Sequence, residues 1–467
     1  MKIEQIYTSC IAEAAYYIES EGEAAIIDPL REFEPYVNKA DEDGAKIKYI
    51  FETHFHADFV SGHLDLAKKT GASIVYGPTA QAGFDIVVAK DGQDFEIGKV
   101  KIRVLHTPGH TMESSTYLLI DEQGKEHAIF TGDTLFLGDV GRPDLAVKTD
   151  LTEKQLASYL FDSLREKIMP LPDEVIVYPG HGAGSSCGKN LSSETVDTLG
   201  NQKKTNYALR SDMTREEFIE ELLDGILPAP QYFPKNAVMN KMGYESIEDV
   251  MHRGNLPLSA EEFESKMKDG ALILDVRSKD EFRESHIPGA MFIGLDGNFA
   301  MWVGALIVDL KRPIILVCPE ERHSEAVMRL ARVGYDESHG YLNGGMKSWI
   351  ESGRTAEKVE SITSSELASN IKSGLKMNIL DVRKIGEYDA EHVEDARHFP
   401  LDYINDNLEE LDKDQKYYVH CKSGYRSMAA VSIMRSAGIK NIVDIQGGMD
   451  AILETDAPVT DFACQDS

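Results

Sequence analysis

Histidine and aspartate residues gather in short motifs within the first 200 residues. Each motif comes directly after an apolar run of the kind that forms a β-strand, so the side chains can converge at one edge of a sheet. The motifs contain His54, His56 and Asp58 in THFHAD, His110 in TPGHT, Asp133 in TGDT and His181 in YPGHG. Imidazole and carboxylate groups are the nitrogen and oxygen ligands that metal ions take in proteins. The pattern therefore predicts a metal site.

A second motif is built around a thiol. The strand-like run YYVH is followed by Cys421, Lys422, Ser423, Gly424, Tyr425, Arg426 and Ser427, and then by a helical segment. A loop of this length can curl around the sulfur and direct backbone N–H groups and a helix N-terminus at it. Both features stabilise a thiolate or a bound persulfide.

A second thiol, Cys187, lies in the loop GAGSSCGKN. The small residues of this loop let backbone amides approach a ligand closely. The neighbouring Lys189 would favour a thiolate at Cys187, and a purely structural cysteine is the alternative. Cys10 and Cys464 have no such context, and we assign them no role.

The elements that position these motifs fall into four segments. Residues 1–200 alternate β-rich runs with turns and a few helical stretches, which predicts packed sheets flanked by helices. Residues 201–256 form a helical connector that we expect to lie over the first domain, with a capping box from Thr214 to Glu217 ahead of the amphipathic stretch FIEELLDGIL. Residues 257–355 and 361–460 repeat one another, and each alternates strands with helices, which predicts a parallel, helix-covered sheet.

Composition narrows the classes of function. The chain has 467 residues, with 49 basic and 79 acidic side chains, so its field repels nucleic acid and anionic membranes. Five scattered cysteines do not make a disulfide framework. No apolar run reaches membrane-spanning length and no signal peptide is seen at the start, so we expect a cytoplasmic protein.

The histidine motifs resemble those of the metallo-β-lactamase superfamily, whose HxHxDH, TPGHT, GD and PGH motifs match in order. The resemblance implies an αββα sandwich over residues 1–200, in an α/β chain. Phe59 stands where HxHxDH ends in histidine, which implies that one metal remains, bound by His54, His110 and Asp133. Two imidazoles and one carboxylate with open positions are typical of mononuclear Fe(II) oxygenases.

Three further groups, His56, Asp58 and His181, would then orient the ligands and water, or be remnants of a two-metal ancestor. His56 is alternatively a weak extra ligand.

Within that superfamily the chain resembles the persulfide dioxygenases, through THFHAD followed by a residue other than histidine, LFLGDVGRPDLA and VYPGHG. The resemblance implies that Arg142 positions the anionic substrate or holds the active-site loop. A structural salt bridge is the alternative for Arg142. Asp144 and Tyr178 would support the pocket.

The repeated segments resemble rhodanese domains. In the second copy, CxxGxRS and LDVR imply that Cys421 accepts sulfane sulfur, while Lys422, Arg426 and Ser427 shape the loop around it. The first copy keeps LDVR and HIPGA, but its loop runs CPEERHS from Cys318, lacks the glycine and brings in two carboxylates. Negative charge beside a persulfide anion opposes the chemistry, so we expect an inactive copy. A shortened but working loop is the alternative.

Together these resemblances imply an enzyme with one Fe(II) per chain that oxidises a low-molecular-weight thiol persulfide with O2 to sulfite and thiol. Cys421 would transfer sulfane sulfur to sulfite, giving thiosulfate, and the reverse direction, in which Cys421 feeds the iron, stays open. The alternative is a zinc-dependent thioester hydrolase resembling glyoxalase II, with the C-terminal pair docking a sulfur carrier. Chains of this kind commonly form homo-oligomers, which we expect here. The sequence does not identify the thiol.

Overall fold

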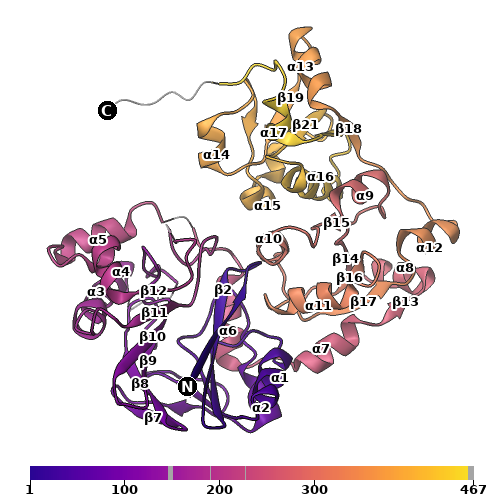
Figure 1. Ribbon diagram of the computed structural model, residues 1–467. Helices are drawn as coiled ribbons and strands as arrows, with labels where there is room; N and C mark the ends of the chain where they lie inside the picture. The colour runs from indigo at the N-terminus through magenta and orange to yellow at the C-terminus, as the bar shows by residue number, and fades with distance from the viewer. Residues whose placement is uncertain (146–150, 190, 227, 461–467) are drawn as a thin grey trace. The chain divides into compact units, whose positions relative to one another are not determined.

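The computed structural model describes residues 1–145, 151–189, 191–226 and 228–460. Residues 1–249 form one compact unit, and the residues from 250 onward, apart from 331–334, form a second (Figure 1). Asn190, the last residue of the loop around Cys187, and Cys464 lie outside the described residues.

The first unit is built on two six-stranded mixed sheets. The first sheet has, in spatial order, β1 (Lys2–Thr8), β2 (Glu13–Ser20), β3 (Glu23–Ile27), β4 (Lys46–Phe51), β5 (Ser73–Tyr76) and β6 (Val87–Val88). The second has β12 (Asp197–Thr198), β11 (Ile176–Pro179), β10 (Glu126–Gly132), β9 (Ser115–Ile120), β8 (Val100–His106) and β7 (Asp94–Ile97). The apolar runs that precede the histidine and aspartate motifs form β4, β8, β10 and β11, as predicted.

Apolar side chains fill the space between the two sheets. Phe51 and Phe95 meet edge to face at 5.5 Å, and Phe51 also lies 4.8 Å from the ring of Tyr117. The outer face of the second sheet is covered by helices, as Figure 1 shows for α3, α4 and α5. Two further helices, α1 and α2, contact β4 in the first sheet. The layers therefore run helix, sheet, sheet, helix, and the predicted αββα sandwich is confirmed.

Side-chain caps begin α3, α4 and α5 of the first unit. Thr214 accepts a hydrogen bond from Glu217 N while the Glu217 carboxylate accepts one from Thr214 N, so the predicted capping box is confirmed. Phe218 and Leu222 then bury themselves against the second sheet. The helices are α1 (Glu34–Glu42), α2 (His63–Thr70), α3 (Glu153–Ser163) continued by a π-helical turn (Leu164–Ile168), α4 (Leu199–Thr205), a 3-10 turn (Tyr207–Leu209), α5 (Arg215–Leu223) and α6 (Phe233–Met242). The segment expected as a connector thus supplies part of the helical layer, and α7 (Ile247–Gly254) contains the boundary between the units.

The second unit contains two five-stranded parallel sheets of identical strand order. The first has β13 (Pro257–Leu258), β17 (Ser338–Leu342), β16 (Ile314–Val317), β14 (Leu272–Asp275) and β15 (Met291–Phe292). The second has β18 (Glu360–Ile362), β22 (Ile442–Ile445), β21 (Tyr417–His420), β19 (Asn378–Asp381) and β20 (Arg397–His398). Both copies match the predicted parallel sheets.

Helices join the strands of each copy in the same sequence. The first copy has α8 (Ala260–Lys268), α9 (Lys279–Glu284), α10 (Phe299–Leu306), α11 (His323–Ala331) and α12 (Gly345–Glu351). The second has α13 (Ser364–Lys372), α14 (Ile385–Ala390), a 3-10 turn (Leu401–Tyr403), α15 (Ile404–Asn407), a further 3-10 turn (Leu408–Glu410), α16 (Tyr425–Ser436) and α17 (Gly448–Ile452).

A buried ion pair recurs at the LDVR motif of each copy. Arg277 Nη2 lies 2.6 Å from Asp275 Oδ2 in the first copy, and Arg383 Nη2 lies 2.7 Å from Asp381 Oδ2 in the second. Each arginine also donates to a backbone carbonyl eight residues ahead of it, at 2.7 and 2.6 Å. The motif therefore anchors the end of a central strand to the segment after the next helix in both copies.

Candidate metal centre and cysteine loops

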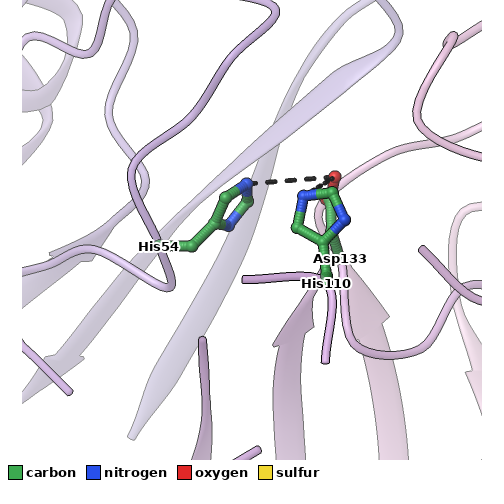
Figure 2. Close-up of side chains that lie close together, drawn as sticks. All are labelled: His54, His110 and Asp133. Atoms are coloured by element: carbon green, nitrogen blue, oxygen red, sulfur yellow. Dashed lines mark ion pairs between the residues drawn. The ribbon is translucent and has the colours of Figure 1, made fainter. Parts of the chain in front are cut away.

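His54, His110 and Asp133 converge as the sequence predicts. The three side chains are buried, and their donor atoms lie within 4.8 Å of one another. Asp133 Oδ2 lies 3.4 Å from His110 Nε2 and 3.9 Å from His54 Nε2 (Figure 2). The residues follow β4, β8 and β10, whose ends meet at one edge of the sandwich.

Hydrogen bonds orient both imidazoles toward the centre. His110 Nδ1 lies 2.8 Å from the carbonyl oxygen of Arg142, which can only accept, so Nδ1 donates this hydrogen bond and Nε2 is the ring nitrogen that faces Asp133. Thr53 Oγ1 gives its one hydrogen to Asp28 and therefore accepts from His54 Nδ1 at 3.0 Å. Because Nδ1 of His54 makes this hydrogen bond, Nε2 is the ring nitrogen that faces Asp133. In metal-binding histidines, a hydrogen bond from the ring nitrogen that does not bind the metal typically holds the ring in its orientation.

The electrostatics of the three residues also suit a cation. Burial and the nearby His56 hold the pKa of His54 well below its usual value, which keeps this imidazole neutral. Although burial favours the protonated acid, the imidazoles of His181 and His110 lower the pKa of Asp133. Asp133 Oδ2 is buried and has no hydrogen-bond partner among the described residues. The neutral imidazole of His54, the imidazole of His110 and an unpartnered carboxylate oxygen fit a divalent metal.

A second group of donors lies next to the first. His181 bridges two carboxylates, with Nδ1 2.8 Å from Asp133 Oδ1 and Nε2 2.8 Å from Asp58 Oδ2. These carboxylates raise the pKa of His181 even though burial opposes its charge. The Cys187 sulfur completes a buried cluster with Asp58 and His181, with donor atoms within 4.8 Å of one another. Phe59, which stands where the family motif has a histidine, is fully buried with its ring 4.3 Å from that of His56. The third donor of this cluster is therefore the thiol of Cys187 and not an imidazole at position 59.

His56 belongs to a different group. Its Nε2 lies 3.1 Å from Asp28 and 3.5 Å from Glu52, and all three side chains are buried. Burial disfavours the imidazolium, yet Asp28 and the other carboxylates raise the pKa of His56 to about 9. Asp28, which also accepts from Thr53 N at 2.7 Å, was missed in the sequence. It follows the apolar run EAAII, so the same strand-end signal could have found it.

Asn240 was also missed, and it comes from α6, far along the chain. Its side-chain amide donates to the carbonyl oxygens of His56 and Phe59 at 2.8 and 2.7 Å, and its Oδ1 accepts from Ser61 N at 2.9 Å. The loop that carries the HxHxD motif is therefore held by one buried amide. Nothing in the local sequence around Asn240 signals this role.

Arg142 holds the loop that contains Cys187. Its guanidinium forms two 2.6 Å hydrogen bonds with Asp144 and donates to Ser186 O at 3.2 Å, while its backbone N–H donates to Cys187 O at 3.0 Å. The Lys189 ammonium donates to carbonyl oxygens at the end of α5, at 2.6 and 2.8 Å. Burial, with Asp58 and Asp133 nearby, raises the pKa of the Cys187 thiol. The expectation that Lys189 favours a thiolate is therefore corrected: the surroundings favour the neutral thiol.

Tyr178 lies in the core between the sheets. Its ring stacks on Phe130 at 5.2 Å and meets Tyr16 edge to face at 5.3 Å. The structure does not bring it together with the donor clusters. Its visible role is packing.

One backbone N–H and the start of α16 lie at the sulfur of Cys421, which is part of the arrangement that the sequence predicts. Gly424 N donates to Cys421 Sγ at 3.1 Å, and α16 begins at the next residue. Gly424 has a φ of 100°, which favours glycine. Arg426 binds Glu387 through two hydrogen bonds of 2.5 and 2.7 Å, and Ser427 Oγ donates to Asp444 at 2.8 Å. The Lys422 side chain is exposed at the rim.

The corresponding loop of the first copy differs. In the described part of the chain no backbone N–H donates to Cys318 Sγ. Burial and Asp275 raise the pKa of the Cys318 thiol. Arg322 binds Glu325 and Asp296, at 2.8 and 2.7 Å. The sulfur cradle of the second copy, in which Gly424 N–H and the start of α16 lie at Cys421 Sγ, is therefore not reproduced.

The N-terminal histidine motifs fall within a match to a family model. Residues 10–181 match the model described as the metallo-beta-lactamase superfamily. The crystal structure of a metallo-beta-lactamase from Staphylococcus aureus is 34% identical, with a TM-score of 0.64, over 73% of this chain and 98% of that one. The chain belongs to the metallo-beta-lactamase superfamily. This superfamily member also carries two matches to the rhodanese-like domain, at residues 259–352 and 363–455.

Curated relatives of this superfamily member carry two kinds of activity in their names. A probable hydroxyacylglutathione hydrolase of Schizosaccharomyces pombe is 32% identical over 188 residues, which are 39% of this chain and 69% of the relative. The human mitochondrial persulfide dioxygenase ETHE1 is 29% identical over 211 residues, which are 45% of this chain and 74% of the relative. None of the described helices of this superfamily member combines the length and apolar character needed to traverse a bilayer.

Proposed function

We propose that this protein is a non-heme Fe(II) persulfide dioxygenase that oxidises a low-molecular-weight thiol persulfide to sulfite and thiol, and that Cys421 couples this reaction to sulfur transfer. The observation that carries the proposal is the convergence of His54, His110 and Asp133 on one point, in a chain that also holds a sulfur-cradling cysteine loop. Resemblance to persulfide dioxygenases supports the same reading.

The residues of the first unit would prepare the site. His54, His110 and Asp133 would hold one iron, which when bound would bring a persulfide sulfur and O2 together for the oxidation. His181 keeps Asp133 ionised and oriented, since its Nδ1 lies 2.8 Å from Asp133 Oδ1. Arg142 would hold the loop that places Cys187 beside Asp58 and His181.

The second rhodanese-like copy would carry sulfane sulfur on Cys421 and pass it to sulfite, giving thiosulfate. Gly424 N–H and the start of α16 would stabilise the negative charge on the sulfur. Arg426, Lys422 and Ser427 would shape the loop. Because both sites lie on one chain, the product of one is available to the other at raised effective concentration.

Purified full-length protein, loaded with iron without air, tests both parts. We expect one iron per chain, O2 uptake on addition of glutathione persulfide, and thiosulfate among the products. Cys421→Ser should keep the O2 uptake and lose the thiosulfate, whereas Cys318→Ser, a matched change in the first copy, should keep both. Undiminished thiosulfate in Cys421→Ser would refute the coupling.

A zinc-dependent thioester hydrolase is the second candidate. It is favoured by the hydroxyacylglutathione hydrolase relatives and by the second donor group of Asp58, His181 and Cys187. In this reading the rhodanese-like pair docks a sulfur carrier. Zinc-loaded protein that hydrolyses S-lactoylglutathione, while iron-loaded protein consumes no O2 with persulfide, would establish the hydrolase and overturn the dioxygenase. A cytoplasmic location and a homo-oligomeric state belong to the main proposal.

A further inference from the structure

One amide group in the Cys421 loop has a partner at each end. Its N–H end is Gly424 N, which donates to Cys421 Sγ at 3.1 Å. Its carbonyl end is Ser423 O, which accepts a hydrogen bond from the ammonium of Lys279. Lys279 is the first residue of α9 and belongs to the first rhodanese-like copy. A cation therefore lies on the carbonyl side of the amide whose N–H faces the sulfur.

The first copy also holds the start of α16, directly after this amide. Tyr425 donates its phenolic hydrogen to Gly294 O at 2.6 Å, and its ring meets Phe292 edge to face at 5.7 Å. Phe292 N donates to Ser432 Oγ, on α16, at 3.0 Å. A Cβ on Gly297 would lie 2.6 Å from Tyr425 Cε2, so the ring occupies the space that a side chain there would need. These contacts hold α16 against the first copy, to which Lys279 also belongs.

An ammonium bound to a carbonyl oxygen draws electron density along the amide and makes the N–H of that amide a stronger donor. The effect is directed at the sulfur here, because the two hydrogen bonds share one peptide group. The titratable and charged groups near the loop are Lys422 and Arg426 within it, Glu387, Asp402, His420, Asp444, Asp296 and Arg329 on neighbouring elements, and Asp280 and Arg283 beside Lys279. The positive charge of Arg426 is balanced by the Glu387 carboxylate, to which it donates two hydrogen bonds.

We propose that the first rhodanese-like copy completes the sulfur site of the second, with Lys279 as a positioning residue that acts through the Ser423–Gly424 amide to stabilise the anionic sulfur of Cys421. The copy with the altered cysteine loop thereby keeps a role in the reaction. The inference rests on the proposed transfer of sulfur at Cys421, and it deepens that proposal by assigning a residue from another domain to the same site.

The test is the pH dependence of alkylation. Full-length protein reacts with iodoacetamide over a range of pH, and modification of the peptide containing Cys421 is followed by mass spectrometry. We expect Lys279→Met to move the midpoint of the profile to higher pH and to slow alkylation at neutral pH by about three- to tenfold, the size expected for weakening one charge-assisted interaction. Lys279→Arg should restore the wild-type profile.

The matched control is Lys347→Met, which removes the same charge from α12, where the ammonium lies 4.0 Å from Glu351. An unchanged profile in Lys279→Met, or an equal shift in Lys347→Met, would overturn the inference. Tyr425→Phe keeps the ring and removes the hydrogen bond to Gly294, so it should shift the profile in the same direction as Lys279→Met. An unchanged profile in Tyr425→Phe would contradict the inference that contacts with the first copy position the Cys421 loop. Transfer of sulfur from thiosulfate to cyanide by the wild type, measured separately, tests the proposed function itself.

Discussion

Gly141 lies between two of the predicted metal ligands: its N–H donates to Asp133 O at 3.0 Å, and a Cβ added to it would lie 3.0 Å from His110 Nδ1. The same Cβ would lie 2.0 Å from Asp133 O, closer than any real contact allows. The next residue, Arg142, supplies the carbonyl that orients His110. The backbone at Gly141 therefore sets the positions of an imidazole and a carboxylate together.

Gly141→Ala should accordingly weaken metal binding. The added methyl group has to displace Asp133 or His110, and disturbing the groups that orient metal ligands typically costs about 10- to 100-fold in affinity. The measurement is metal retained per chain during competition with a chelator. Gly386→Ala is the control, because a Cβ there meets nothing within 4 Å. Equal metal retention in the two variants would contradict the prediction.

Phe59→His should raise the metal content of zinc-loaded protein from one toward two ions per chain. The new imidazole would stand next to Asp58, and Asp58 and His181 already lie 2.8 Å apart. The new imidazole would add a fourth donor to the cluster of Asp58, His181 and Cys187, and a closed zinc site takes four ligands. Phe59→Leu, which adds no ligand, should leave the metal content unchanged. Metal analysis after removal of loosely bound ions decides between these outcomes.

Asn240→Leu should destabilise the first unit by about 2–4 kcal/mol, because it leaves two buried carbonyls and one N–H of the metal-site loop without their partner. Metal affinity should fall with it. Denaturant unfolding and metal competition measure the two effects. Val238→Ala on the same helix is the control, since the Val238 side chain is 57% exposed. A stability loss no larger than that of the control would show that the amide does not hold the loop.

Asp444 should make the second rhodanese-like copy less stable as pH rises. Burial raises its pKa from 3.8 to about 6, so between these values the folded state keeps a proton that the unfolded state releases. The contribution of Asp444 to stability is then greatest below pH 3.8 and is lost above pH 6, a difference of up to about 3 kcal/mol.

Asp444→Asn can still accept the hydrogen bond of Ser427 but does not titrate, and it should remove this pH dependence. Hydrogen exchange of the α16 amides, followed against pH in both proteins, reads the local stability. Parallel pH profiles in the wild type and the variant would show that Asp444 does not titrate as expected.

The sequence was a good guide wherever a short motif follows a strand. His54, His110 and Asp133 could be predicted to meet because the ends of neighbouring strands lie at one edge of a sheet. The Cys421 loop could be predicted because strand, glycine-containing loop and helix are consecutive. In both cases the information is local, and the fold class follows from the same alternation of strands and helices.

The remaining residues depend on contacts between distant segments. Asn240 reaches the metal-site loop from α6, and Lys279 reaches the Cys421 loop from the other copy. Neither residue lies in a recognisable motif. Each acts by donating a hydrogen bond to a backbone carbonyl of a distant segment, and the sequence does not show which segments meet. Lys189 shows the converse: it is two residues from Cys187, yet its ammonium binds the end of α5.

The buried aspartate–arginine pair is present in both rhodanese-like copies, whereas the sulfur cradle is present in one. Because Asp275 and Arg277 anchor the sheet of the first copy, the loop at 318–322 can differ from the Cys421 loop while the sheet keeps its strand order. For protein engineering this makes 318–322 a graft site, where a foreign recognition loop can replace the native one on an already folded scaffold.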